Sequence, residues 1–227
     1  MRYLICVGLL SGCNVLFPEF SGNPMDMTSG DAIGDGGTGA VHGAVCLLTD
    51  VTSLSTCAAS TAGFHIGVEE TREVVDSDGL GNFTLTQYAP TLTIGVVDKS
   101  AQTTPAVIRI AGGSTGTVVV PMVSAQTLST VAYDNGVVLD DTHGSILVFA
   151  TNTSGTPLAG VQGTAISGAA GPLYEAGPNA LLPGTATGSH GSIAWLNVTS
   201  GDIQLTVGAG SFKLPVRTRA LTFSLLQ

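Results

Sequence analysis

The chain has 227 residues, enough for two small domains or one large β-sandwich, because domains cluster around roughly 100 to 150 residues. Hydrophobic residues make up 44% and charged residues only 10%, and 31 glycines accompany abundant Thr, Ser and Val; this composition is typical of β-strands separated by tight turns. Sixteen acidic residues against seven basic ones give a formal net charge of −9, which excludes nucleic acid as a partner because its phosphates would be repelled.

The N-terminus carries an export signal. Arg2 precedes the apolar run YLICVGLL at residues 3–10, which is far shorter than the roughly 20 residues of a membrane-spanning helix. The next residues, Leu10-Ser11-Gly12-Cys13, resemble the lipobox of bacterial lipoproteins. The resemblance implies a signal peptide over residues 1–12 and a Cys13 that carries several acyl chains, palmitate among them, which together anchor a protein stably in a membrane. An ordinary signal peptide with a chance cysteine is the alternative.

The residue after Cys13 bears on localisation. It is Asn14 rather than the Asp that retains many lipoproteins at the inner membrane. The resemblance to that sorting rule implies delivery to the bacterial outer membrane or cell surface.

The cysteines also fit export. Loss of Cys6 with the signal peptide and lipidation of Cys13 would leave only Cys46 and Cys57. An even pair around a Ser/Thr-rich turn predicts a disulfide in an oxidising compartment. His42 and His65 lie nearby in the sequence, but no paired metal-ligand spacing exists, so no metal site is expected.

Residues 13–39 are rich in Pro, Gly, Asp and Ser, which predicts a flexible tether after the lipidated cysteine. From residue 40 onward, short β-like runs alternate with turn signals and form two series, residues 40–123 and 142–227, joined by a connector at residues 124–141. A Gly/Ser/Pro-rich insertion is expected at residues 167–191. The predicted strands are residues 41–48, 81–85, 91–97, 107–111 and 117–123, then 144–150, 161–166, 192–198, 202–207 and 221–226.

The two series align as a weak internal repeat of about 100 residues, a length that suits a β-sandwich. His42-Gly43 opens the first series and His143-Gly144 opens the second. Each series then has a turn that enters an alternating strand, at Asp78-Gly79 and at His190-Gly191, and each closes on a hydrophobic strand.

The motifs of the second series resemble a known family. Gly144-Ser145-Ile146, then Thr156-Pro157-Leu158-Ala159-Gly160-Val161, then Gly191-Ser192-Ile193, then Ser200-Gly201-Asp202 are similar to the carboxypeptidase regulatory-like domain, and residues 40–123 match it more weakly. That family is a transthyretin-like β-sandwich. The pattern departs from the family where Ile193 replaces Phe and Ser200-Gly201 replaces Pro-Gly.

Residues that could indicate a functional site have plain structural explanations. Residues 76–82 resemble a calcium loop, but Leu80 and Gln87 stand where ligands are needed, so a hairpin turn explains them better. His42, His143 and His190 each precede Gly in a turn context, and only His65 stands apart. No catalytic elbow, metallohydrolase or phosphate-loop motif occurs, and the residue sets of the transthyretin-like hydrolases and dioxygenases cannot be assembled.

A sugar-binding platform would require exposed aromatic residues. Alternation places Trp195 on the same face as Ile193, which predicts that it is buried. A platform would then depend on Tyr88, Tyr133 or Tyr174.

The sequence therefore predicts an all-β chain of two tandem transthyretin-like or immunoglobulin-like β-sandwiches after a signal peptide and tether. The expected function is a non-enzymatic structural or interaction module of the cell envelope, without cofactor, attached to the membrane by its N-terminal lipid. The alternative is a surface module that binds a glycan or peptide, and an enzyme of the transthyretin-like group is a third hypothesis.

Overall fold

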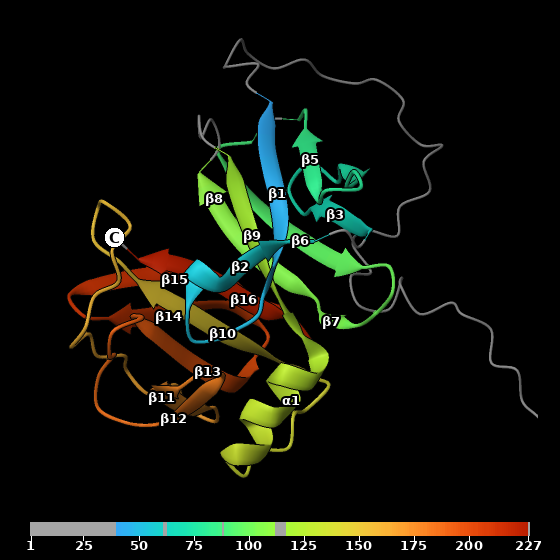
Figure 1. Cartoon of the computed structure of the whole chain (residues 1–227). Helices are drawn as coiled ribbons and strands as arrows, with labels where there is room; N and C mark the ends of the chain where they lie inside the picture. The colour runs from blue at the N-terminus through green and yellow to red at the C-terminus, as the bar shows by residue number, and fades with distance from the viewer. Residues whose placement is uncertain (1–39, 61–62, 88, 112–116, 227) are drawn as a thin grey trace, which may run out of the picture.

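The computed structural model describes residues 40–60, 63–87, 89–111 and 117–226 (Figure 1). The predicted signal peptide, the lipidation site Cys13 and the tether at residues 13–39 lie outside these described ranges. In chain order the elements are β1 (Val41–Leu48), the short helix η3 (Leu54–Thr56), β2 (Cys57–Ala59), β3 (Phe64–Val68), β4 (Val74–Asp76), β5 (Asn82–Leu85), β6 (Thr91–Asp98), β7 (Thr103–Thr104), β8 (Ala106–Ala111), β9 (Val118–Ser124), α1 (Ala125–Asp134), β10 (His143–Ala150), β11 (Ala170–Gly177), β12 (Ala180–Pro183), β13 (Ser192–Thr199), β14 (Gly201–Val207), β15 (Gly210–Val216) and β16 (Leu221–Leu226).

The protein is built almost entirely of β-sheet, which confirms the predicted all-β class. A nine-stranded sheet has the order β12-β11-β13-β10-β16-β8-β6-β3-β4. A five-stranded sheet has the order β2-β1-β9-β7, with β5 also paired to β1, and β14 and β15 form a two-stranded sheet. Among the described residues, no helix is long and apolar enough to cross a membrane.

The internal repeat predicted from the sequence has a counterpart in the strand pairing. In the first half, β1 pairs with β5 in antiparallel fashion and with β9 in parallel fashion. In the second half, β10 pairs with β13 in antiparallel fashion and with β16 in parallel fashion. The first strand of each half is therefore flanked by its equivalent partners in the same two orientations.

The two halves are joined edge to edge. Strand β16 from the second half pairs in parallel with β8 from the first, from Leu221 opposite Ala106 to Phe223 opposite Ile108. Beyond this short pairing the two strands run in different directions (Figure 1). One sheet thus crosses both halves, and the independence of residues 40–123 and 142–227 as folding units stays a prediction.

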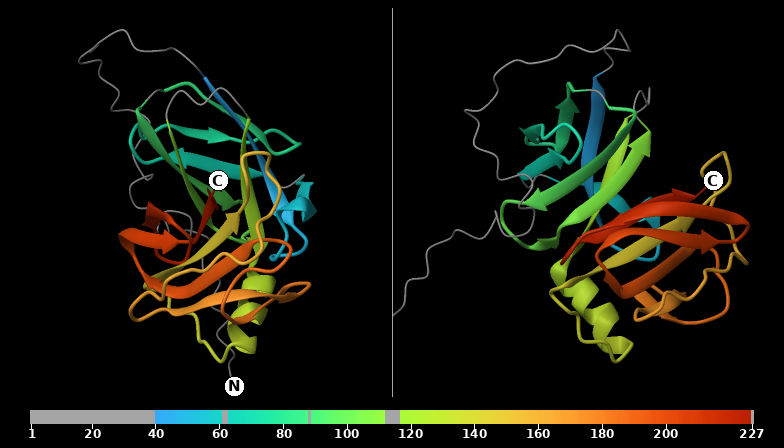
Figure 2. Two further views of the ribbon diagram at one scale, coloured as in Figure 1. Left: turned by 90° about the vertical axis from the view of Figure 1, so that its left-hand side faces the viewer. Right: turned by 180° about the vertical axis from the view of Figure 1, so that it is seen from behind.

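The sheet of the second half is buried on both faces. Along β10, Ile146 and Val148 belong to one hydrophobic cluster, whereas Leu147 and Phe149 belong to another, and all four are at most 1% exposed. The first cluster includes residues of β14 and β15, and the second is shared with the first half. Figure 2 shows the two halves against each other, with α1 beside the second. Continuous apolar runs are expected where both faces of a strand are covered.

The strand predicted at residues 161–166 was wrong. The segment has only an isolated bridge between Gly163 and Val207. Part of its backbone bonds to β14 and the residue after it, since the Thr164 N–H donates to the Thr206 carbonyl and the Gly208 N–H donates to the Gln162 carbonyl. Other backbone groups bond to side chains: the Gly163 N–H donates to the Tyr174 hydroxyl at 3.0 Å and the Thr164 carbonyl accepts from the Trp195 indole at 3.0 Å. A Cβ at Gly163 would lie 2.6 Å from the Trp195 ring, so the ring packs directly against the glycine backbone.

Other elements were missed. The predicted insertion at residues 167–191 contains β11 and β12, and the connector at residues 124–141 contains α1. The helix begins after Ser124, whose hydroxyl accepts a hydrogen bond from the Thr127 N–H at 2.9 Å. A serine N-cap satisfies one of the unpaired amides of the first turn, which explains why the helix begins there.

Candidate interaction site

The halves meet where Ala106–Ile108 of β8 pair with Leu221–Phe223 of β16, a contact called the joint below. An apolar groove of about 740 Å³ lies beside the joint and is bounded by β1, β8, β9 and β16. It opens where the pairing of β8 with β16 ends at Phe223, while β16 continues to Leu226. Three large apolar side chains at this groove, Leu80, Val119 and Leu225, are 65%, 47% and 54% exposed. The sequence alone does not reveal this groove, because its walls come from strands that are distant in the chain.

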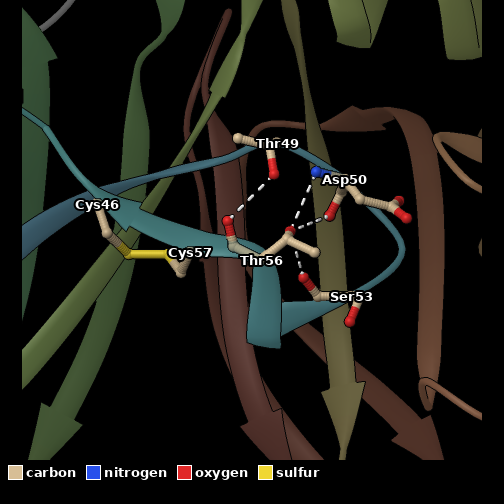
Figure 3. The surroundings of a disulfide bond; sticks show 6 residues. All are labelled: Cys46, Thr49, Asp50, Ser53, Thr56 and Cys57. Atoms are coloured by element: carbon tan, nitrogen blue, oxygen red, sulfur yellow. Dashed lines mark hydrogen bonds between the residues drawn. A yellow bond between two sulfur atoms is a disulfide. The ribbon is translucent and has the colours of Figure 1, made fainter.

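The predicted disulfide forms one wall of the groove. Cys46 and Cys57 are bonded, with their Cα atoms 5.4 Å apart, and the bond ties β1 to β2 (Figure 3). The loop that it closes is held internally by Thr56, whose hydroxyl donates to the Ser53 carbonyl and accepts from the Asp50 N–H (Figure 3). The loop is therefore a compact structure rather than a loose insertion.

The same loop contacts the second half of the chain. Asn179, in the turn between β11 and β12, accepts from the Val51 N–H at 2.9 Å and donates its backbone N–H to the Asp50 carboxylate at 2.9 Å. Partial burial alone would raise the pKa of Asp50, but hydrogen bonds from Asn179 and Thr52 hold it below its ordinary value. The disulfide thus stabilises a loop that links the two halves.

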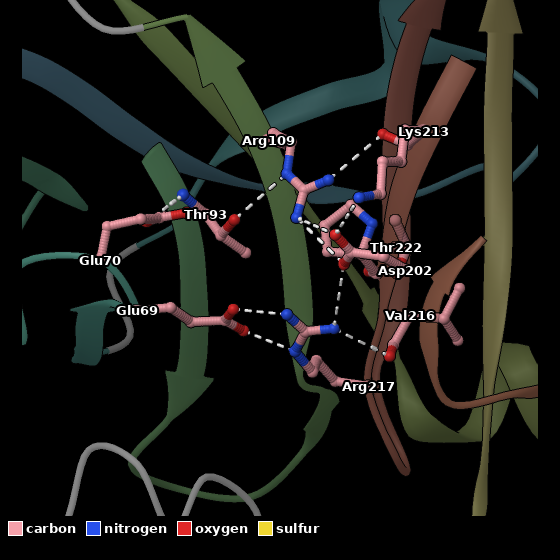
Figure 4. A network of polar contacts seen from close by, with 10 residues as sticks. Glu69, Glu70, Thr93, Arg109, Asp202, Lys213, Val216, Arg217 and Thr222 are labelled. Atoms are coloured by element: carbon pink, nitrogen blue, oxygen red, sulfur yellow. Dashed lines mark hydrogen bonds and ion pairs between the residues drawn. The ribbon is translucent and has the colours of Figure 1, made fainter. Parts of the chain in front are cut away.

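A network of charged residues also crosses the joint (Figure 4). Arg217, after β15, forms a two-pronged ion pair with Glu69, which follows β3. Arg109 on β8 donates to both carboxylate oxygens of Asp202 on β14, at 3.0 and 3.1 Å. Lys213 and Arg217 also approach Asp202, at 3.4 and 3.7 Å. Each of these two main pairs joins a residue of the first half to a residue of the second.

The carboxyl of Asp202 is at the centre of this network. Partial burial alone would raise its pKa, but hydrogen bonding and charge from Arg109, followed by Lys213, lower the pKa below its ordinary value. Asp202 is therefore ionised at neutral pH. The network is a structural set of ion pairs, since both Glu69 and Asp202 already have a basic partner.

The four histidines are not brought together into a catalytic cluster. The His42 ring lies 3.1 Å from the Thr84 hydroxyl, and the His65 ring lies 2.6 Å from Asp76, which also binds Lys99. His143 is the first residue of β10 and its ring pairs with Asp140. His190 lies in a turn, and its backbone N–H donates to the Glu175 carboxylate. Among the described residues, no group of three or more His, Cys, Asp or Glu side chains could hold a metal ion.

The segment resembling a calcium loop is a turn. The Asp78 carboxylate accepts hydrogen bonds from the Leu80 and Asn82 N–H groups, both at 2.8 Å, and from the Asn82 side chain at 3.0 Å. The pKa of Asp78 is lowered chiefly by that side-chain bond. The prediction of a hairpin was wrong, because β4 pairs with β3 while β5 pairs with β1, so the turn connects two different sheets.

The aromatic residues form no platform in the described part of the chain. Trp195 is completely buried, as predicted, and Tyr174 is 4% exposed with its hydroxyl bound to the backbone. Tyr133 is 83% exposed on α1, away from the groove lining, and Tyr88 lies outside the described residues. The candidate glycan-binding tyrosines are therefore not gathered at one site.

No family model matches the sequence, and a search of curated proteins finds no relative. Solved structures give remote matches that each cover 83% of this chain. The shaft pilin SpaA from Lactobacillus rhamnosus GG is 8% identical and covered over 97% of its length, with a TM-score of 0.28. A streptococcal ancillary pilin is 12% identical and covered over 62%, with a TM-score of 0.24. The Bacillus anthracis TIE protein is 11% identical with a TM-score of 0.26, and this chain spans 34% of that protein. At these TM-scores the backbones do not superpose closely, so the function proposed below rests on the chain's own residues.

Proposed function

We propose that the chain is a non-enzymatic lipoprotein of the bacterial cell envelope, in which two β-sandwich halves form one rigid structural or interaction module. The lipobox-like sequence ending at Cys13 supports anchoring at the outer membrane or cell surface through an N-terminal lipid. The single observation that supports the rigid module best is the joint, where the halves share a sheet and the Glu69–Arg217 and Arg109–Asp202 pairs.

The joint explains why a module would be rigid. Domains within a chain usually move relative to each other unless their interface is large and hydrophobic. Here Phe149, Leu173 and Leu196 of the second half belong to the same hydrophobic cluster as Leu85 and Leu92 of the first. Separating the halves would expose this shared core and leave the part-buried ion pairs without partners.

Calorimetry tests this proposal. Heating the full chain should give one unfolding transition, with calorimetric and van't Hoff enthalpies that agree, because a shared core makes unfolding cooperative. Two resolved transitions would show that the halves unfold independently and would contradict the rigid module.

A second candidate function is binding of a protein segment or a glycan at the surface. The exposed apolar groove favours a peptide, since contiguous exposed apolar surface marks interaction sites. A glycan site is favoured less, because sugar recognition depends on exposed aromatic faces and the described groove lining has none.

A further inference from the structure

We propose that the Cys46–Cys57 disulfide is a redox-sensitive latch between the two halves. A protein dithiol reduces the bond from the groove, and the loop that the bond closes then loosens its hold on the second half. This inference rests on the two-half module proposed above and adds its regulation. The halves can be rigidly joined in the oxidised protein whether or not the bond responds to thiols, so the two proposals can fail separately.

The first argument is access to the bond. Both cysteines line the open groove, and Cys57 is part-exposed at the start of β2. The two residues after it, Ala58 and Ala59, are exposed and have small side chains. Thiol–disulfide exchange requires a thiolate to reach a sulfur atom directly, so a bond beside a groove is open to reduction in a way that a bond in a closed core is not.

The second argument is what the bond holds. Strand β2 has three residues, and among the described residues it pairs only with β1. The disulfide crosses this short pairing from Cys46, opposite Ala59, to Cys57, opposite Leu48. A two-stranded hairpin of this length is marginal by itself. The bond therefore fastens the base of the loop at residues 49–56.

The third argument is what the loop contacts. Besides its bonds to Asp50 and Val51, Asn179 donates its side-chain amide to the Thr49 carbonyl at 3.1 Å. Val51 is 2% exposed and belongs to the hydrophobic cluster that the halves share. Freeing the base of the loop would therefore loosen a buried contact between the halves.

The chemistry is thiol–disulfide exchange with a dithiol as the two-electron reductant. One thiolate of the dithiol bonds to the Cys57 sulfur, the Cys46–Cys57 bond breaks, and Cys46 leaves as a thiolate. The second thiolate of the dithiol then displaces Cys57 and closes a disulfide within the reductant. The two cysteine thiolates take up the two protons that the dithiol loses, so the products are two protein thiols and one oxidised dithiol.

The reduced protein should stay folded. The loop keeps the hydrogen bonds of the Thr56 hydroxyl to Asp50 and Ser53, and the nine-stranded sheet contains neither cysteine. Local opening without global unfolding is what distinguishes a latch from a bond that only supports the fold.

The test measures amide hydrogen exchange of the full chain, first oxidised and then treated with dithiothreitol under native conditions. The reporters are the Val51 and Asn179 amides, because each donates a hydrogen bond across the contact. Thiol alkylation followed by mass spectrometry measures how much of the bond is reduced in the folded protein. Cys46→Ala/Cys57→Ala represents the permanently open state.

A second variant breaks the contact and leaves the disulfide intact. Asn179→Gly removes the side chain at a position whose φ of 54° glycine adopts readily. Asn197→Gly is the matched control, because Asn197 has the same φ and its side chain bonds to the backbone of Val138 and Asp140 instead.

We expect dithiothreitol to reduce the bond in the folded chain. Exchange at the Val51 and Asn179 amides should then accelerate at least about tenfold, whereas exchange in β10 should change by less than about twofold. The double alanine variant should show the fast exchange and no response to dithiothreitol. Asn179→Gly should accelerate exchange at Val51 while the bond is intact, and Asn197→Gly should not.

Three outcomes would overturn the latch. One is that dithiothreitol reduces the bond only in denaturant. Another is that the bond is reduced in the folded chain but exchange at Val51 and Asn179 is unchanged. The third is that reduction unfolds the whole chain, seen as loss of the near-ultraviolet circular dichroism, which would make the bond purely structural. A single cooperative calorimetric transition of the oxidised protein alongside any of these would leave the rigid module standing.

Discussion

Arg217 and Glu69 lie 148 positions apart in the sequence, yet the Arg217 guanidinium bonds to both oxygens of the Glu69 carboxylate. The pair is part-buried, with side chains 22% and 18% exposed, and it joins the segment after β15 to the segment after β3. Removing one member of such a pair leaves the other charge without its partner.

Arg217→Met should therefore lower the thermal stability of the full chain, by about 1 to 3 kcal/mol. The matched control is Arg219→Met, because Arg219 pairs with Asp141 on an exposed surface. Exposed pairs contribute about 0 to 1 kcal/mol, so the control should change little. Equal effects of the two substitutions in thermal unfolding would show that the Arg217 pair has no special role at the joint.

Limited proteolysis tests the predicted boundary between the halves. A cut within residues 124–141 should give two fragments, as the internal repeat predicts. Because β8 pairs with β16 and the halves share a core, the fragments should remain associated and elute together in gel filtration. Separate elution would support two independent sandwiches, and cuts confined to residues 13–39 or 167–191 would favour one continuous unit.

The disulfide should stabilise the protein. Loss of the bond in Cys46→Ala/Cys57→Ala should cost about 2 to 3 kcal/mol, because the closed loop is short. Chemical denaturation measures the difference. Thiol labelling of denatured, non-reduced protein that finds both cysteines free after export would contradict the bond itself.

Acid should weaken the joint through Asp202. Because its folded-state pKa is lowered, its contribution to stability is present above the ordinary value of 3.8 and is lost as the pH falls through the lower folded-state pKa. The stability of the wild type should therefore fall in this acidic range more steeply than that of Asp202→Asn. Parallel pH profiles of the two proteins in denaturant unfolding would refute this assignment.

Gly43 tests the packing at the start of the first half. A Cβ at this position would lie 2.1 Å from the Phe83 ring across the β1–β5 pair. Gly43→Ala should therefore destabilise the protein by about 1 to 3 kcal/mol, and Phe83→Leu should restore part of the loss. Gly79→Ala is the control, since its Cβ would meet nothing within 4 Å. Similar thermal stability of the two glycine variants would disprove the predicted clash.

The sequence predicted those parts of the fold that depend on local patterns. The runs at residues 41–48 and 221–226 coincide with β1 and β16, because hydrophobic strands between turn residues are visible in a short window. The disulfide followed from counting cysteines, and the burial of Trp195 followed from alternation. These features need no knowledge of distant contacts.

Features that depend on distant contacts could not be predicted. Residues 161–166 make only one isolated bridge and a few backbone bonds to β14, while other backbone groups bond to the Trp195 and Tyr174 side chains. The groove and the ion pairs arise only when β8 meets β16. One signal was available, since Arg109 stands within the apolar run AVIRIA and a charged residue there requires a partner.

The most direct test of the account is the mature N-terminus of the exported protein. Mass spectrometry should find a chain that begins at Cys13 and carries diacylglycerol and a further acyl chain, and membrane fractionation should place it with the outer membrane. Cys13→Ser should abolish the lipid and leave an uncleaved precursor or a protein in the aqueous phase. A mature wild-type chain that begins at any residue other than an acylated Cys13 would contradict the proposed lipoprotein.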